Sequence, residues 1–304
     1  MQLQKQAMID LYSIIKMNNS LIENKIDVAV LDKYAAIIGE KPSNGARSPE
    51  LWNKVFKESD LNYKMVPMDV SENKLKSLLN SLNNDERFLG GAITAPYKEV
   101  VADWLGKNIS EEAKEIGAVN CLFRNSENQL FGTNTDGEAS LKSFNDNFGS
   151  INDKNIMILG VGGAGKAVAA YFAKSAKSTI LVSRSLSGKN YSKKIGAIWK
   201  SWEDINDYLF NVDVLLNCTS IGFQSQESKS PLNQDQISSL SQSSIIFDII
   251  YQPLETRLLL MAKNNNIQTL NGLKMNLEQA VLAYKYAINT NLTLDQVYKI
   301  MSKV

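Results

Sequence analysis

The feature that most constrains the fold is a short apolar run that ends in a cluster of glycines. Residues 154–160 read KNIMILG, and an Ala-rich segment of helical character follows at 166–175. A continuous apolar run of this length is typical of a strand buried on both faces of a parallel sheet. Further strand-like runs at 178–182, 213–217 and 245–250 alternate with helical or loop segments. Strands spaced by helices predict right-handed crossovers, so the fold class is α/β.

The glycines form the pattern G-x-G-x-x-G directly after this strand and directly before the helix. In that context glycines allow the backbone to approach a pyrophosphate, and the helix N-terminus adds partial positive charge. The alternative is a tight strand–helix turn without a ligand. We therefore expect a Rossmann-type dinucleotide-binding domain, with these residues at the cofactor: Gly160, Gly162, Gly163, Ala164 and Gly165.

The end of the next strand indicates which dinucleotide is bound. An acidic residue there would accept hydrogen bonds from the ribose 2′-hydroxyl and repel a 2′-phosphate. This chain instead has Ser183, Arg184 and Ser185, with Lys189 shortly after and no carboxylate nearby. Arg184 can pair with a phosphate and stack on adenine, and the serines can donate to the phosphate. The alternative is an exposed arginine at a strand end; the pattern favours NADP over NAD.

The length and net charge of the chain limit its domain number and its possible partners. A chain of 304 residues suits two domains of ordinary size. The formal net charge of +1 provides no electrostatic excess for holding a polyanion, so nucleic acid is not an expected partner. No apolar run approaches the length of a membrane span, and the N-terminus lacks the pattern of a signal peptide. The expected location is the cytoplasm, without membrane contact.

The chain contains no histidine. Catalytic triads that need an imidazole and histidine-ligated metal sites are therefore excluded, and no metal is expected. Acid–base chemistry must use Lys, Asp, Glu, Tyr or Cys. The two cysteines, Cys121 and Cys218, lie far apart in or beside apolar runs, which indicates buried reduced thiols.

Helical and strand signals also mark the two ends of the chain. Apolar residues at roughly helical spacing, among them Met8, Leu11, Leu21 and Ile22, predict one or two short helices over about residues 1–30. A strand is expected at 34–38. Helices are expected from about Pro49, from near Gly272, and from near Thr293, where Gln296 could complete a capping box.

Several further motifs follow one another in a fixed order, from T-A-P-Y-K to G-L-K-M. This set resembles the shikimate dehydrogenase family across roughly residues 34–290. The segments that carry the resemblance are T-A-P-Y-K at 94–98, A-V-N at 118–120, N-T-D-G at 134–137, N-C-T-S-I-G at 217–222, D-I-I-Y-Q-P at 248–253 with Thr256, and G-L-K-M at 272–275 with Gln279.

The resemblance implies a two-domain enzyme that interconverts 3-dehydroshikimate and shikimate with NADP, a step toward chorismate and the aromatic amino acids. The substrate-binding α/β domain, with a mostly parallel sheet, would comprise 34–137 completed by 272–304. The NADP-binding domain would comprise 138–271, and 1–33 would form an N-terminal helical extension. The substrate would lie in the cleft, and the protein would be a monomer or a homodimer.

By the same resemblance Lys98 and Asp136 form the catalytic pair. Hydride addition to a ketone leaves an alkoxide, and a lysine ammonium supplies both a proton and a positive charge. A lone Lys98 would otherwise be a solvated charge, and a lone Asp136 a turn or cap residue. The resemblance implies Ser48, Thr94, Asn120, Tyr251 and Gln279 as substrate ligands, and adds Thr219 and Gly272 to the cofactor ligands.

The chain departs from the family on the substrate side. The family's S-x-S-P pair, which binds the substrate carboxylate, keeps only its second serine here, because Ala46 replaces the first. Arg47 could replace the lost hydroxyl, although a solvent-facing side chain is the expected state. The preceding loop is one residue longer, and three further positions differ from the usual residue: Ala92, Lys274 and Asn276.

These departures leave alternatives open. A paralogue could act on quinate, an amino-shikimate or another cyclic hydroxy-carboxylate. A non-catalytic dinucleotide-binding protein would bind NADP without turnover. Another Rossmann enzyme, such as a folate-linked methylene dehydrogenase or a tRNA-linked reductase, would share the glycine loop but not the T-x-P-x-K and N-T-D-G segments.

Overall fold

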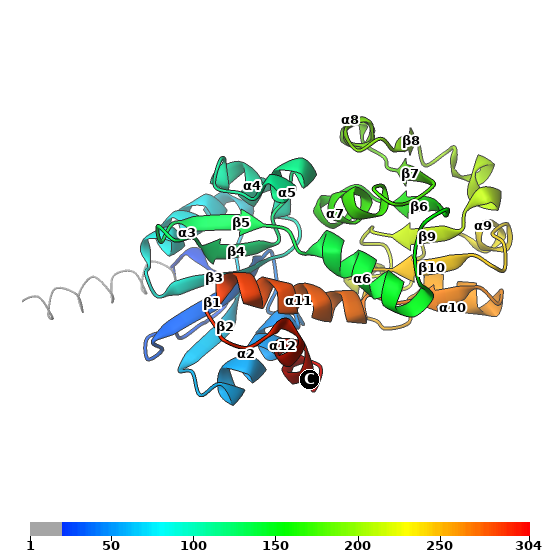
Figure 1. The fold of residues 1–304 in the computed structure, drawn as a ribbon. Coiled ribbons are helices and arrows are strands. Elements are labelled where there is room, and N and C mark those ends of the chain that lie inside the picture. Colours follow the sequence, from blue (N-terminus) through cyan, green and yellow to red (C-terminus); the bar gives the residue numbers. More distant parts are fainter. Residues whose placement is uncertain (1–19) are drawn as a thin grey trace, which may run out of the picture. The chain divides into compact units, whose positions relative to one another are not determined.

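A computed structural model describes residues 20–304, which fold into two compact α/β units (Figure 1). The first unit contains the described chain through Thr135 together with residues 280–304, and the second contains residues 136–279. The chain passes from the second unit back to the first inside helix α11 (Leu273–Ala287). The first turns of α11 therefore belong to the second unit, whereas the sequence motifs assigned all of 272–304 to the substrate domain.

The first unit is built on a five-stranded mixed sheet with the order β2-β1-β3-β4-β5. Its first three strands run parallel, and the β4–β5 hairpin adds an antiparallel edge. The expected strand at 34–38 is confirmed as β1. The strands are β1 (Lys33–Gly39), β2 (Tyr63–Asp69), β3 (Phe88–Ile93), β4 (Cys121–Arg124) and β5 (Leu130–Thr133).

Helices follow each of the first three strands of this sheet. The helix expected near residue 49 begins at Ser48, with Pro49 in its first turn, where a missing N–H does no harm. The helix expected near Thr293 is also confirmed: the Thr293 side chain accepts from the N–H of Gln296, and the Gln296 side chain accepts from the N–H of Thr293. The helices are α2 (Ser48–Glu58), α3 (Glu72–Asn84), α4 (Lys98–Leu105), α5 (Glu111–Ile116), the end of α11 and α12 (Leu294–Met301).

The N-terminal helices expected over 1–30 lie mostly outside the described residues. Within the described part, helical backbone ends at Leu21, so the expectation is wrong for residues 22–30. The reason is tertiary pairing: the N–H of Glu23 donates to the carbonyl of Asp69, and the N–H of Asp69 donates to the side chain of Asn24. This segment therefore runs along the end of the edge strand β2.

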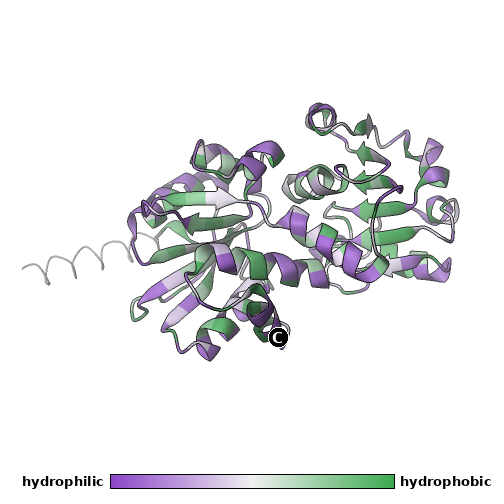
Figure 2. Ribbon diagram, viewed as in Figure 1, coloured by the Kyte–Doolittle hydropathy of each residue, from purple (hydrophilic) through white to green (hydrophobic). Residues whose placement is uncertain are grey.

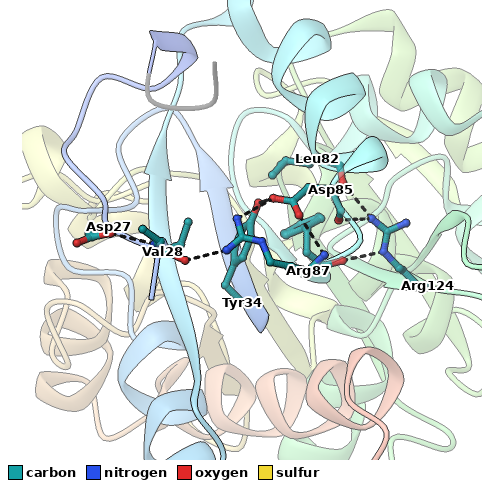
Figure 3. Close-up of polar contacts among 9 residues, drawn as sticks. Asp27, Val28, Tyr34, Leu82, Asp85, Arg87 and Arg124 are labelled. Carbon is teal, nitrogen blue, oxygen red and sulfur yellow. Dashed lines mark hydrogen bonds and ion pairs between the residues drawn. The ribbon is translucent and has the colours of Figure 1, made fainter. Parts of the chain in front are cut away.

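A buried polar network closes the opposite end of β1 (Figure 3). The carboxylate of Asp85 accepts hydrogen bonds from the Tyr34 hydroxyl at 2.9 Å and from the N–H of Arg87 at 3.0 Å. Burial and the neighbouring Asp85 raise the pKa of Tyr34. The Arg124 guanidinium donates to backbone carbonyls at the end of α3, and the Arg87 guanidinium donates to the backbone carbonyl of Val28. The Arg124 guanidinium thus satisfies the carbonyls of Leu82, Asn83 and Asp85, which the end of the helix leaves without a partner within it.

The second unit is built on a six-stranded, fully parallel sheet with the order β11-β10-β9-β6-β7-β8. The strands expected at 154–160, 178–182, 213–217 and 245–250 are confirmed as β6, β7, β9 and β10. The Ala-rich helix begins earlier than expected, at Gly163 inside the glycine motif. The strands are β6 (Asn155–Leu159), β7 (Ser178–Val182), β8 (Ile198–Lys200), β9 (Val214–Asn217), β10 (Ile245–Asp248) and β11 (Gln268–Leu270).

Helices cover this sheet, and the strands supply its apolar core, which appears green in Figure 2. Alternate residues of β6, Met157 and Leu159, join one core cluster together with side chains of α9 and α10. No helix in the described part of the chain is long and apolar enough to cross a membrane. The helices are α6 (Asp136–Phe148), α7 (Gly163–Phe172), α8 (Leu186–Lys194), α9 (Gln234–Ser238), α10 (Arg257–Asn264) and the beginning of α11.

Candidate active site

The glycine-rich loop joins β6 to α7 in the second unit. A Cβ atom at Gly165 would lie 2.1 Å from the carbonyl oxygen of Gly160, so only glycine allows the helix to pack this closely on the loop. A Cβ atom at Gly162 would meet no protein atom within 4 Å. The need for glycine at 162 is therefore not explained by packing within the protein, and its backbone is open to a bound group.

A pocket of about 680 Å³ opens beside this loop. It lies at the carboxyl ends of β6, β7 and β9, where strand order reverses between β6 and β9. Open α/β sheets bind their ligands at such a switch point. Six of the expected cofactor residues line the pocket, together with side chains that no motif indicated. The lining residues are Gly160, Val161, Gly162, Ser183, Arg184, Ser185, Trp202, Cys218, Thr219, Ser220, Ile221 and Gln226.

The three residues at the end of β7 differ in their surroundings. Ser183 is buried, and its hydroxyl accepts a hydrogen bond from the indole of Trp199 at 3.0 Å and donates to the carbonyl of Ser185. Its one donor hydrogen is thus used inside the protein and is not offered to an anion. Ser185 and Arg184 are exposed, and the Ser185 hydroxyl lies 2.7 Å from that of Ser187. Arg184 and the Ser185–Ser187 pair are the groups available to an anion at this end of the pocket.

Thr219 follows β9 on the other side of the strand-order switch. Its hydroxyl donates to the Asn217 side chain at 2.7 Å and accepts from the N–H of Ile221 at 3.1 Å, so these bonds fix the local conformation of the N-C-T-S-I-G segment. Desolvation by burial raises the pKa of the neighbouring Cys218, with Asp248 and Asp136 adding to the rise. Cys218 is therefore a neutral thiol in the pocket wall.

The remaining expected cofactor residues lie elsewhere in the loop or the fold. Gly163, Ala164 and Gly165 begin α7 and do not line the pocket. Gly272 lies against β10: a Cβ atom there would lie 1.9 Å from the carbonyl oxygen of Ile249. Close packing between the chain before α11 and the end of β10 accounts for glycine at this position.

In the first unit, Thr94 and Lys98 lie at the carboxyl end of the sheet. The N–H of Thr94 donates to the carbonyl of Ile38 at 2.9 Å, so the T-A-P-Y-K segment continues directly from β3 beside β1. Tyr97 is buried and donates from its hydroxyl to the carbonyl of Val70 at 2.7 Å. Lys98 begins α4, and its carbonyl accepts from the N–H of Val119. The T-A-P-Y-K segment is thus hydrogen-bonded to β1, to the residue after β2 and to the A-V-N segment.

Asn120 and Thr135 form a closed pair in the same region. The Asn120 amide donates to the Thr135 hydroxyl at 3.0 Å, and its carbonyl oxygen accepts from the N–H of Thr135 at 2.8 Å. The Asn134 amide donates to the carbonyl of Ala118 at 3.0 Å. The A-V-N and N-T-D-G motifs are thus bound to each other, and both are buried.

Ser48 is buried at the first turn of α2. The N-terminus of a helix favours a negative group, so the location suits a carboxylate. Ala46, half-buried in the preceding loop, offers no hydroxyl. Arg47 is half-buried, and its guanidinium donates to the backbone oxygen of Val304 at 3.3 Å in an exposed contact, in keeping with the expected solvent-facing side chain.

Three expected ligands belong to the second unit. Asp136 is buried as the first residue of α6. Tyr251 is half-buried in the loop after β10, and Gln279 donates from its side chain to the carbonyl of Asn276 at 2.8 Å. Ser48, Thr94, Lys98 and Asn120 are grouped in the first unit, so the predicted substrate ligands are divided between the two units.

The departure at Lys274 has a local explanation. Its ammonium lies 2.7 Å from the carboxylate of Asp146, which also binds Lys142 at 2.7 Å, and Lys142 in turn pairs with buried Glu278 at 3.2 Å. Hydrogen bonds from Lys142 and Lys274 lower the pKa of Asp146. The lysine therefore joins an ion network that ties α6 to the beginning of α11.

Comparison with known proteins agrees with these features. The family model described as the shikimate dehydrogenase substrate binding domain matches residues 37–122. The NADP-dependent shikimate dehydrogenase of Clostridium beijerinckii is 34% identical over 252 residues, which cover 83% of this chain and 90% of that protein. That of Pyrococcus abyssi is 34% identical over 256 residues, covering 83% and 91%.

A solved structure supports the same relationship. The crystal structure of a shikimate dehydrogenase in complex with NADP+ superposes with a TM-score of 0.78 at 28% identity, covering 92% of this chain and 97% of that one. A match over 92% of the chain extends over both units. The chain belongs to the shikimate dehydrogenase family.

Proposed function

We propose that this protein catalyses the NADP-linked interconversion of 3-dehydroshikimate and shikimate. The observation that carries the proposal is family membership over most of the chain together with the intact T-A-P-Y-K and N-T-D-G segments, which hold Lys98 and Asp136. In this proposal the first unit supplies most of the substrate ligands, and the second unit binds NADP.

The residues of the second unit fit NADP. The pocket beside the glycine loop has room for a nucleotide, and the N-terminus of α7 provides partial positive charge for a pyrophosphate. Among the described residues that line it, none is Asp or Glu, and exposed Arg184 suits a 2′-phosphate. NADP, when bound, supplies the hydride for the ketone or accepts it from the alcohol.

The chain's own residues would then manage charge and protons. Lys98 donates a proton to the oxygen that becomes a hydroxyl, and its ammonium stabilises the negative charge that develops there. Asp136 accepts a hydrogen bond from a ring hydroxyl next to the reacting carbon. Ser48 and the N-terminus of α2 bind the carboxylate, and Thr94, Asn120, Tyr251 and Gln279 bind or orient hydroxyls.

A second candidate is favoured by one observation: the carboxylate loop lacks the family's first serine, and Arg47 is engaged with Val304. A paralogue that acts on quinate, an amino-shikimate or another cyclic hydroxy-carboxylate would tolerate this change. The candidate retains the hydride chemistry and alters only the substrate.

The test is a spectrophotometric assay of NADPH formation with shikimate and NADP, with quinate and with NAD as parallel arms. Rapid NADP reduction on shikimate alone supports the first candidate, and preference for quinate supports the second. NADP binding without turnover on any arm would contradict both and point to a non-catalytic dinucleotide-binding protein.

A further inference from the structure

The loop of residues 40–47 carries the chain from β1 to Ser48. It contains turns closed by its own backbone, with the N–H of Asn44 bound to the carbonyl of Lys41 and that of Ala46 to Pro42. Such local turns determine the shape of the loop but not its position on the body of the protein. Its position depends on contacts with groups outside the loop.

Asp69 provides such a contact in the middle of the loop. It is the last residue of β2 and only 8% exposed. One of its carboxylate oxygens accepts from the N–H of Ser43 at 2.9 Å, and the other accepts from the Ser43 hydroxyl. Hydrogen bonds to an ionised carboxylate are stronger than neutral ones, and a two-point contact also fixes orientation.

The backbone of Asp69 is itself held from the N-terminal side. Its N–H donates to the side-chain oxygen of Asn24 at 2.8 Å, and its carbonyl accepts from the N–H of Glu23 at 2.8 Å. The Asn24 amide also donates to the carbonyl of Pro67 at 2.9 Å. The outer edge of β2 is therefore hydrogen-bonded at the residue that presents the carboxylate, and these bonds hold the backbone of Asp69 in place.

We propose that Asp69 is a positioning residue for substrate binding: through Ser43 it fixes the 40–47 loop and so the place of Ser48 and Ala46 at the substrate carboxylate. This rests on the proposed function, in which Ser48 binds that carboxylate. Neither carboxylate oxygen of Asp69 needs to touch the substrate. The contact between Asp69 and Ser43 should affect substrate binding more in this chain than in one with two serines, because Ser48 supplies the remaining side-chain hydroxyl of the S-x-S-P pair.

The experiment compares Asp69→Ala with Asp85→Ala. Both remove a buried aspartate that accepts hydrogen bonds at an end of the same sheet, but Asp85 lies at the opposite end, in the network of Figure 3. We expect Asp69→Ala to raise the KM for shikimate by about tenfold with kcat and the KM for NADP little changed, the pattern of lost uniform binding. Asp85→Ala should lower thermal stability and leave the KM for shikimate unchanged.

Two further variants keep the test decisive if Asp69→Ala folds poorly. Ser43→Ala removes the hydroxyl and leaves Asp69 and the sheet intact, so it should give a smaller increase in the same KM. Asp69→Asn retains an oxygen for the N–H of Ser43 and should recover part of the wild-type value. An unchanged KM for shikimate in Asp69→Ala and Ser43→Ala, or an equal increase in Asp85→Ala, would overturn the proposal.

Amide hydrogen exchange separates this proposal from the proposed function. Exchange in residues 40–47 should become faster in Asp69→Ala than in the wild type, whatever the substrate. Faster exchange in a protein that does not turn over shikimate would retain the positioning role of Asp69 and contradict the proposed function. Alternatively, the wild type turns over shikimate while Asp69→Ala changes neither the exchange of residues 40–47 nor the KM for shikimate. That result would contradict the positioning role of Asp69 and leave the proposed function intact.

Discussion

The carboxylate of Asp248, at the end of β10, accepts a hydrogen bond from the Thr256 hydroxyl at 2.7 Å, and Thr256 caps the N-terminus of α10. The same carboxylate accepts from the Asn217 amide at 3.1 Å, which joins β9 to β10. The D-x-x-Y-x-P-x-x-T motif thus connects two strands and a helix in the second unit. This buried contact explains the spacing between Asp248 and Thr256.

The first prediction concerns the pH dependence of stability. Desolvation by burial raises the pKa of Asp248 to about 6, opposed by hydrogen bonds from Thr256, the backbone of Ile250 and Asn217. Because the pKa is higher in the folded state, the contribution to stability is fully present below about pH 4 and is lost as pH rises through about 6. The loss is about 3 kcal/mol for such a shift.

Asp248→Asn should remove this titration. Urea unfolding across that pH range should show a smaller decline in the free energy of unfolding for the variant than for the wild type. Exposed Asp32→Asn is the control and should keep the wild-type profile. Parallel profiles for Asp248→Asn and the wild type would show that Asp248 does not titrate in this range.

The second prediction concerns proton transfer. Lys98→Ala should lower turnover by about two to four orders of magnitude, the usual contribution of a general acid or base. NADP affinity should be retained, because the pocket beside the glycine loop is lined by the second unit. Lys98→Arg should fail as well, since a guanidinium keeps the charge but does not release a proton readily. Exposed Lys107→Ala is the matched control, and wild-type turnover in Lys98→Ala would remove Lys98 from the mechanism.

The third prediction concerns cofactor choice. Arg184→Asp should raise the KM for NADP by about 10- to 100-fold, because a charged hydrogen-bond partner is replaced by a repulsive one. The KM for NAD, which has no 2′-phosphate, should change little. Exposed Lys177→Asp makes the same change of charge at the opposite end of β7 and should leave the preference unaltered. If the ratio of NADP to NAD use is the same in both variants, Arg184 does not bind the 2′-phosphate.

The fourth prediction concerns the carboxylate loop. Ala46→Ser restores the hydroxyl that the family usually has, and should lower the KM for shikimate by about two- to tenfold, the value of one added hydrogen bond. Ser48→Ala should raise the same KM. A higher KM in Ala46→Ser would indicate that the loop is shaped for another substrate, which favours the paralogue.

Local sequence patterns predicted the elements that depend on local chemistry. The apolar run before the glycines is β6, and the capping box of Thr293 and Gln296 forms as expected. The early start of α7 was missed because the glycine motif reads as a loop, yet Gly163 already has a helical conformation. Ordered motifs predicted the family, because the chemistry of the site restricts which residues follow each strand.

Tertiary structure decided the roles that depend on distant partners. Ser183 has the sequence context of a phosphate ligand, but its hydroxyl donates to the carbonyl of Ser185; Gly272 packs against Ile249; and Arg47 donates to Val304. The sequence alone determined the α/β class and the glycine loop, because these follow from local period and spacing, and the resemblance to the family indicated the segments that hold Lys98 and Asp136. Only the fold decided which polar side chains remain available to a ligand, because a hydrogen bond to a residue far along the chain leaves no trace in local sequence.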